Sequence, residues 1–144
     1  MDLAEKLDAV EEIKKLKARY FRFVDTRQFD ALRALFIPDA TFDGKEAGMG
    51  ILPDLDAFIA GCEGGLKGCV SVHHGHCPEI ELTSETTATG IWPMEDMLKW
   101  EEGAASPVRS LHGMGHYHER YEKHDGHWKI AHWNLTRLRV DTVP

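Results

Sequence analysis

Apolar residues recur at steps of three and four over the first 25 positions, which is the pattern of an amphipathic helix. Residues 4–25 are therefore predicted to form one helix, with charged Glu and Lys side chains between the apolar ones. The apolar positions are Leu3, Leu7, Val10, Ile13, Leu16, Tyr20 and Val24. A second, shorter helix is predicted over residues 29–36, and Pro38 prevents it from continuing.

Glycine and proline residues interrupt helices and strands in the middle of the chain, so only short elements are predicted there. Residues 40–43 are expected to form a short strand, and residues 44–53 a glycine-rich loop. A third helix is predicted over residues 55–62, because Asp54 is a suitable N-cap and two glycines, at 64 and 65, follow its end.

From Cys69 onward the pattern changes to long segments rich in β-branched and aromatic residues, which is typical of strands. Strands are predicted over residues 70–82, 86–100, 108–123 and 128–140. The pair Asp125-Gly126 between the last two indicates a hairpin. Helices followed by long strands predict an α+β fold, in which a curved antiparallel sheet carries the helices on one face. Such a cone encloses an apolar cavity that can bind a small molecule.

The composition is that of an ordinary globular chain, and residues 1–144 are predicted to form a single domain. Acidic residues (24) outnumber basic ones (17), which argues against a nucleic-acid partner. No apolar run approaches the roughly 18 residues that span a bilayer, and the acidic N-terminus lacks the layout of a signal peptide. The three cysteines show no C-x-x-C spacing and are expected to be reduced thiols of a cytoplasmic protein.

Two acidic residues occupy positions that require a partner. Asp25 stands at the C-terminal end of the first helix, where the helix dipole disfavours a negative charge. Asp96 shares a strand face with Trp92 and Met94, and a charge on an apolar face must be paired or perturbed. The basic residues Arg137 and Arg139 are expected to pair with acidic residues at the surface or at a subunit contact.

Nine histidines are the compositional outlier, and they gather in two stretches. Strict alternation places His74 and His76 on the face of Ile80, and His73 on the other. A bulge between Gly75 and Pro78 would reverse that parity, so alternation alone does not choose between His73 and His74.

Two alternatives to an acid–base site remain open. The pairs His74/His76 and His116/His118, with Glu119 or Glu122, would resemble the metal ligands of a cupin. A cupin is all-β, however, and does not open with a long amphipathic helix, so no metal and no cofactor are expected. A non-catalytic module that binds a small molecule is the other alternative.

Four segments resemble the SnoaL-like family of the nuclear-transport-factor-2-like superfamily: residues 23–28, residues 73–75, residues 92–96 and residues 115–118. The resemblance implies an α+β cone of the cystatin-like roll type. It also implies cofactor-free lyase chemistry, as in bile acid 7α-dehydratase, scytalone dehydratase and hexachlorocyclohexane dehydrochlorinase. Family members commonly assemble, so a homodimer or homotrimer is expected.

The resemblance assigns a catalytic pair to His73 and Asp25, a tyrosine to Tyr20 and a second aspartate to Asp96. In the dehydrochlorinase a lysine stands at the position of Tyr20 and an arginine at that of Trp133. These departures favour a dehydratase.

The roles follow from the chemistry of removing water from a β-hydroxy carbonyl compound. His73 would be the base, Asp25 would orient its ring and Tyr20 would stabilise the enolate. Asp96 would protonate or anchor the departing hydroxyl. Substrate contacts are predicted for Phe21, Trp92, His116, Trp133 and Asn134, which suit a small hydrophobic substrate such as a steroid or polyketide ring. Isomerisation of an enone by the same pair is the alternative reaction.

Overall fold

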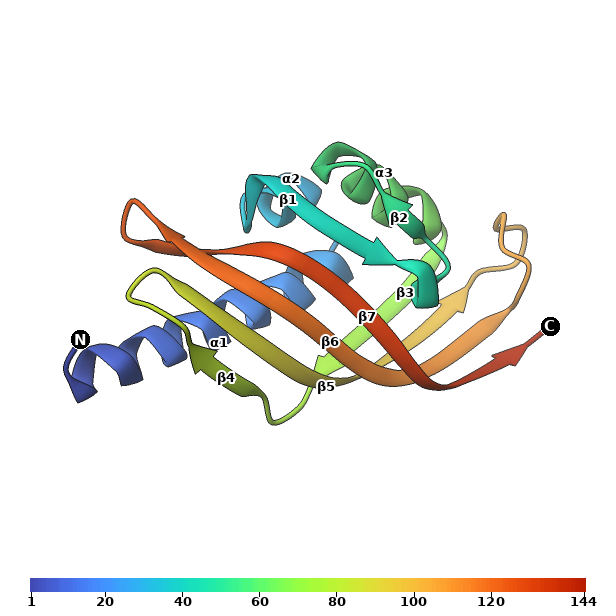
Figure 1. Ribbon diagram of the computed structural model, residues 1–144. Helices are drawn as coiled ribbons and strands as arrows, with labels where there is room; N and C mark the ends of the chain where they lie inside the picture. Colours follow the sequence, from blue (N-terminus) through green and yellow to red (C-terminus); the bar gives the residue numbers. More distant parts are fainter.

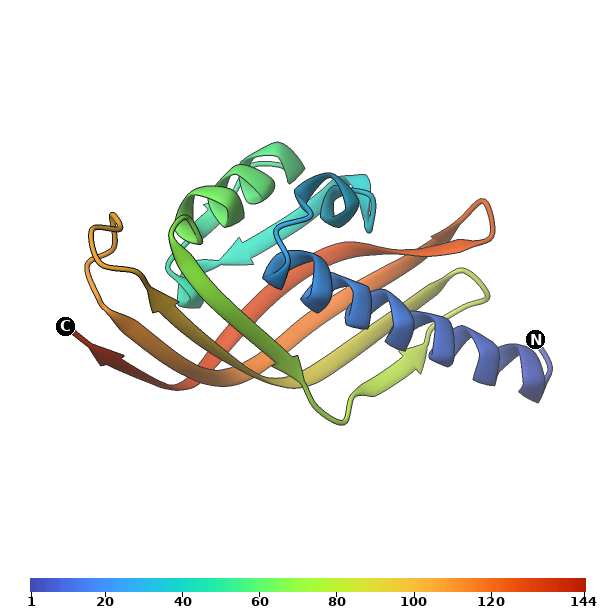
Figure 2. The same cartoon turned by 180° about the vertical axis from the view of Figure 1, so that it is seen from behind.

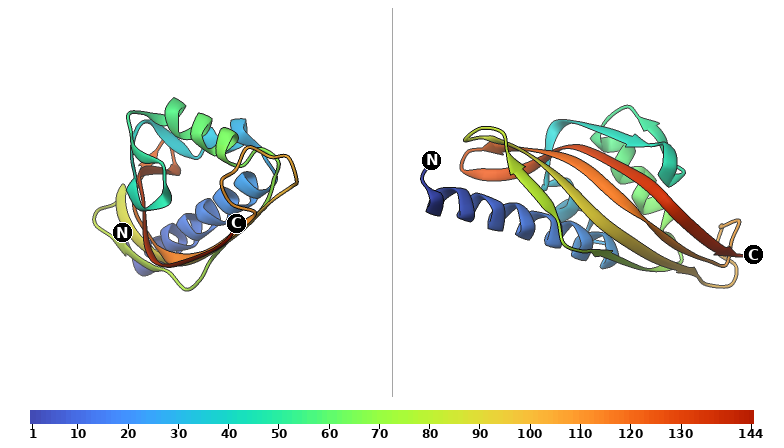
Figure 3. Two further views of the ribbon diagram at one scale, coloured as in Figure 1. Left: turned by 90° about the vertical axis from the view of Figure 1, so that its right-hand side faces the viewer. Right: turned by 60° about the horizontal axis from the view of Figure 1, so that its bottom comes forward.

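The computed structural model describes residues 1–144 as a large curved sheet with three helices on its concave side (Figure 1, Figure 3). The helices are α1 (Leu3–Asp25), α2 (Phe29–Arg33) and α3 (Leu55–Gly65), and a 3-10 turn covers Lys45–Ala47. The strands are β1 (Phe36–Gly44), β2 (Gly50–Leu52), β3 (Cys69–Gly75), β4 (Glu79–Leu82), β5 (Thr87–Trp100), β6 (Ser110–His124) and β7 (His127–Val143). Figure 2 shows α1 crossing the inner face of the sheet.

The sheet has the strand order β2-β1-β7-β6-β5-β3, and β4 also pairs with β5. Neighbouring strands are antiparallel except β1 and β7, which run parallel. The α+β cone predicted from the sequence is therefore confirmed, with one parallel pair in the sheet. None of the helices combines the length and the hydropathy that crossing a bilayer requires.

The helix α1 forms where the apolar periodicity predicts it. Its start is fixed by a reciprocal cap, in which the Asp2 side chain accepts from the Glu5 N–H and the Glu5 side chain accepts from the Asp2 N–H. Its C-terminal half packs on the sheet, whereas Leu3 and Leu7 are exposed because the first turns reach the end of the sheet (Figure 3). Those two residues continue the apolar period of the helix without a sheet residue to cover them.

Local turn chemistry accounts for several other boundaries. Asp54 accepts from the Ala57 N–H at 2.8 Å and caps α3 as predicted. Asp125 and Gly126 take positive φ values of 51° and 80°, which the predicted hairpin turn requires.

The segment from residue 29 to residue 53 differs from the prediction. The helix α2 ends at Arg33, and Phe36 begins β1, so Pro38 lies within a strand. The expected glycine-rich loop contains β2, which pairs with the end of β1. Tertiary pairing with β1 orders this short segment, whose own sequence carries little strand signal.

Candidate active site

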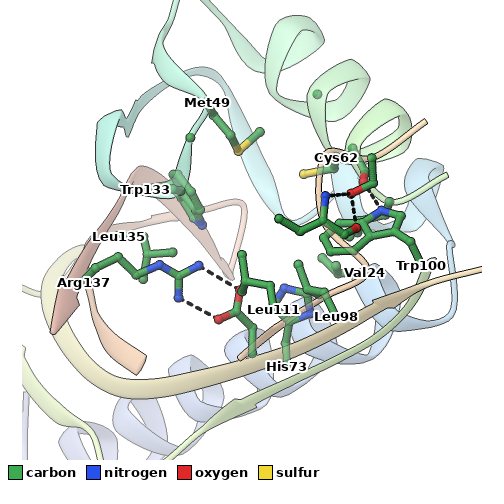
Figure 4. Close-up of a pocket in the computed structure, with 18 of the residues that line it drawn as sticks. Val24, Met49, Cys62, His73, Leu98, Trp100, Leu111, Trp133, Leu135 and Arg137 are labelled. Atoms are coloured by element: carbon green, nitrogen blue, oxygen red, sulfur yellow. Dashed lines mark hydrogen bonds and ion pairs between the residues drawn. The ribbon is translucent and has the colours of Figure 1, made fainter. Parts of the chain in front are cut away.

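A cavity of about 520 Å³ opens between the C-terminal end of α1, the helix α3 and the inner face of the sheet (Figure 4). Most of its lining residues are hydrophobic. The polar and aromatic groups that α1 and the strands β3, β5, β6 and β7 contribute include Tyr20, His73, Asp96, Tyr117, Trp133 and Arg137. A cavity of this kind suits a small, largely apolar molecule that carries a few polar groups.

His73 and Asp25 form a histidine–carboxylate pair at this cavity. The distance from His73 Nδ1 to Asp25 Oδ1 is 2.7 Å. Asp25 also accepts from the Ser71 hydroxyl at 3.0 Å and from the His73 backbone N–H at 2.8 Å. These three donors from β3 stabilise a carboxylate at the C-terminal end of α1, where the helix dipole opposes it. Because Nδ1 is engaged, Nε2 is the ring nitrogen left for a ligand.

An extra residue between β3 and β4 determines which histidine faces the cavity. Gly75 pairs with Met94, and Glu79 pairs with Ile91, so four residue steps on one side oppose three on the other. This bulge reverses the parity, as the sequence allowed. His73 consequently shares the inner face with Asp96, its partner in the sheet register, while His74 is exposed.

Asp96 is buried and paired within the cavity wall. Arg137 Nη1 donates to Asp96 Oδ1 at 2.6 Å, and Arg137 Nη2 donates to Asp96 Oδ2 at 3.0 Å (Figure 4). The expectation that Arg137 pairs at the surface or at a subunit contact is wrong. Arg137 lies on the inner face with Trp133 and Leu135, which line the same cavity. Because residues two positions apart on a strand share a face, this spacing was the sequence signal that Arg137 points inward. A bidentate guanidinium binds the ionised carboxylate, so this pairing weakens the predicted proton-donor role of Asp96.

Gly113 makes this pairing possible because β6 lies between Asp96 on β5 and Arg137 on β7. A Cβ at position 113 would overlap the Arg137 guanidinium and the Asp96 carboxylate. Arg137 therefore reaches Asp96 across the strand only where no side chain intervenes.

Replacing Gly113 by alanine is expected to separate Arg137 from Asp96 and to lower the free energy of unfolding by about 1–3 kcal/mol. Denaturant unfolding measures this change. Gly64→Ala is the control, since that glycine lies in α3 with open space around its Cα, and alanine there stabilises helices by up to about 1 kcal/mol. Equal stability of the two variants would show that the bidentate pair survives the added methyl group.

Tyr20 is buried in the cavity wall and hydrogen-bonded through its hydroxyl oxygen. Trp133 Nε1 donates to that oxygen at 2.9 Å, so the phenol O–H remains a donor. Burial raises the pKa of Tyr20 well above its usual value, and the residue stays neutral at physiological pH. Tyr117, an edge-to-face neighbour of Tyr20, has a raised pKa for the same reason.

Of the five residues predicted to contact substrate, Trp133 lines the cavity and the other four do not. The Trp92 indole N–H is engaged by the Tyr121 hydroxyl, away from the cavity. Phe21 packs against the rings of Tyr20 and Tyr117, behind the cavity wall. His116 and Asn134 have the opposite parity to Tyr117 and Trp133, so they lie on the outer face of the sheet.

The two H-x-H pairs do not converge on one site. His74 and His76 lie near Glu95 on the outer face, where His112 Nε2 is 3.0 Å from the same carboxylate. His118 bonds Thr136, and Glu119 is engaged by Lys17. No group of three or more His, Cys, Asp or Glu side chains is arranged to hold a metal ion.

The open α+β cone, with its cavity between helices and sheet, places the chain in the nuclear-transport-factor-2-like class of folds. Within that class, the family model of the SnoaL-like domain matches residues 5–134. The chain therefore belongs to the SnoaL-like family.

Individual relatives are more distant. The chain is 25% identical to the probable cyclase FGR4 of Gibberella zeae over 142 residues, which cover 91% of this chain and 92% of the relative. It superposes on a protein assigned as a scytalone dehydratase from Novosphingobium aromaticivorans with a TM-score of 0.86, 20% identity and 99% and 93% coverage of the two chains. For the hexachlorocyclohexane dehydrochlorinase LinA-type3 of Novosphingobium barchaimii, the TM-score is 0.82 at 20% identity, with 99% and 94% coverage. At this level of identity, the structural matches establish a shared fold alone.

Proposed function

We propose that this protein is a cofactor-independent carbon–oxygen lyase that removes water from a hydrophobic ring substrate carrying a β-hydroxy carbonyl group. The observation that carries the proposal is the 2.7 Å contact between His73 Nδ1 and Asp25 Oδ1, with the His73 ring in the wall of an apolar cavity. The name of the sequence relative, the probable cyclase FGR4, supports chemistry on a ring compound.

His73 is suited to abstract the proton next to the carbonyl group. Its Nε2 is the nitrogen not engaged by Asp25, and imidazole is a base that works near neutral pH. Asp25 holds the tautomer and stabilises the imidazolium that forms. The C–H electron pair forms the enolate, with its negative charge on the carbonyl oxygen. When the enolate re-forms the carbonyl group, the new C=C bond forms as the C–O bond breaks. The departing hydroxide takes the proton from the imidazolium and leaves as water, so His73 returns to its starting form.

Two cavity groups can stabilise the charge that develops during this step. Tyr20 can donate its phenol O–H to the carbonyl oxygen as the enolate forms. The Arg137–Asp96 pair presents polar atoms at the same cavity, and the revised role for Asp96 is to hold the guanidinium in place. Desolvation raises the pKa of Cys62, the cavity-lining thiol, to about 12, which does not favour a thiolate nucleophile.

The direct test is proton exchange followed by a substrate screen. The wild-type protein is expected to exchange the C–H next to the carbonyl of a ring ketone for deuterium in D2O, and His73→Ala is expected to abolish this exchange. His74→Ala is the matched control, because that neighbouring side chain is exposed on the opposite face. NMR or mass spectrometry measures the exchange.

The screen of ring β-hydroxy ketones and thioesters separates the alternatives by product. Loss of one water supports the lyase, whereas a product of unchanged mass with a shifted double bond identifies an isomerase. Binding without exchange in any ketone would overturn the catalytic proposal and favour a binding module.

A further inference from the structure

A second polar cluster lies behind the cavity wall, completely out of contact with solvent. Lys17 of α1 and Glu119 of β6 are both fully buried, and Lys17 Nζ donates to Glu119 Oε2 at 2.8 Å. Glu119 Oε1 accepts from the Tyr121 hydroxyl at 2.8 Å, and that hydroxyl accepts from Trp92 Nε1 at 2.9 Å. Neither Lys17 nor Glu119 lines the cavity.

The Lys17 ammonium lies against the two tyrosine rings that separate it from the cavity. Its Nζ is 3.7 Å from the ring centroid of Tyr20 and 3.6 Å from that of Tyr117. Glu119 is its only carboxylate partner, so the positive end of the ion pair is the end that touches the tyrosines. Contacts of a cation with an aromatic face strengthen when water is excluded, as it is here.

Stability alone is a poor explanation for charges at this place. Taking a lysine and a glutamate out of water has a large desolvation penalty, and well-packed apolar residues of similar volume are often as stable or more so. The pair does, however, place the Lys17 ammonium on the ring face of Tyr20, the group that would meet the developing enolate, and there it opposes the Glu119 charge, which adds to burial in raising the pKa of Tyr20.

We propose that Lys17 is a positioning residue that acts through Tyr20: its ammonium, held by Glu119 on the face of the phenol ring, makes the Tyr20 hydroxyl a stronger hydrogen-bond donor to the oxyanion. The inference rests on the proposed function. A preorganised charge in a water-excluded site stabilises developing negative charge with no reorganisation during the reaction.

The test is a double-mutant cycle with a charge-neutral replacement. The variant Lys17→Met/Glu119→Gln removes both charges, keeps the approximate volume and leaves an oxygen for the Tyr121 hydroxyl. We expect it to lower kcat about 30-fold, the equivalent of a desolvated cation–π contact of about 2 kcal/mol. In a Tyr20→Phe background the same two substitutions should cause no further loss. An equal loss in both backgrounds would show that Lys17 supports the fold and not Tyr20.

Measured over pH values at which the folded fraction is constant, the pH profile gives a readout that a structural role would not move. Burial lowers the pKa of Lys17 to about 8, against the opposing effect of Glu119. Above this pH the ammonium loses its proton, while burial, which raises the pKa of Tyr20, Tyr117 and Tyr121, keeps those phenols neutral. Activity should therefore fall as the pH rises through about 8 in the wild type, and this limb should be absent in the double variant. A limb that persists there contradicts the proposal.

A measurement without substrate separates this inference from the proposed function. A fluorinated tyrosine, whose phenol is more acidic, is incorporated at position 20 and titrated by 19F NMR. Removal of the two charges should raise the pKa of that phenol, and an unchanged pKa would overturn the inference. If the pKa of the phenol at position 20 rises but the proton-exchange screen fails, the lyase proposal is contradicted while the coupling of Lys17 to Tyr20 is still supported.

Discussion

Replacing His73 by alanine is expected to lower the kcat of water elimination by about 10²–10⁴-fold, because general-base catalysis by a positioned side chain contributes that much. The cavity itself should be preserved, since His73 lies in its wall and not in the apolar core. KM should therefore change much less than kcat. Steady-state kinetics on a ring substrate from the screen measure both constants, with His74→Ala as the control.

Asp25→Asn is expected to cause a loss of similar size, about 10²–10⁴-fold. An amide cannot satisfy the three donors that Asp25 accepts from, and it does not stabilise an imidazolium as a carboxylate does. A substrate-free signature accompanies the loss: the His73 ring N–H proton, protected by Asp25, should give an NMR signal that disappears in the variant. Unchanged kcat in Asp25→Asn would falsify the dyad, and full activity of His73→Ala would remove the base.

Lys17→Met, made alone, is expected to lower the free energy of unfolding by about 3–5 kcal/mol, the usual result of breaking a buried ion pair. The loss arises because Glu119, which is fully buried, is left with a charge and no cation. Adding Glu119→Gln should recover most of the stability, because the one uncompensated charge is then removed. Urea unfolding of the single and double variants measures both effects.

The chain offers a matched control on the same helix. Lys15 Nζ lies 2.8 Å from Glu12 Oε1, the same distance as between Lys17 and Glu119, but that pair is largely exposed. Lys15→Met should therefore leave the unfolding free energy almost unchanged. If Lys15→Met and Lys17→Met destabilised the protein equally, burial of the Lys17 pair would not be the cause.

Sequence patterns correctly predicted the elements that residues close together in the sequence determine. The helix over residues 4–25 was predicted from its apolar period, the start of α3 from Asp54 and the last hairpin from Asp125-Gly126. Predictions failed where pairing with a distant strand decides the structure. The strand β2 exists because β1 is beside it, and residues 70–82 divide into β3 and β4 around an extra residue.

In the site, too, some side chains could be recognised from the sequence and others only from the structure. Asp25 and Asp96 stood out in the sequence because each placed a carboxylate where an unpaired charge is unfavourable. The identity of their partners was not readable in the same way, because Ser71 and Arg137 are ordinary residues in a sequence until the sheet register is known. Arg137 reaches Asp96 only across Gly113, a position defined by three strands together.

The sequence by itself determined the fold class, the α+β cone, and the resemblance suggested the pairing of His73 with Asp25 by analogy. Only the tertiary structure decided which histidine faces inward, where Arg137 lies, and that Lys17 is buried against two tyrosines. Periodicity records whether a position is apolar, so it treats Lys17 as part of the charged face of α1. The packing of α1 on β6 places that lysine next to Glu119, 102 residues away, and such a contact has no local signature.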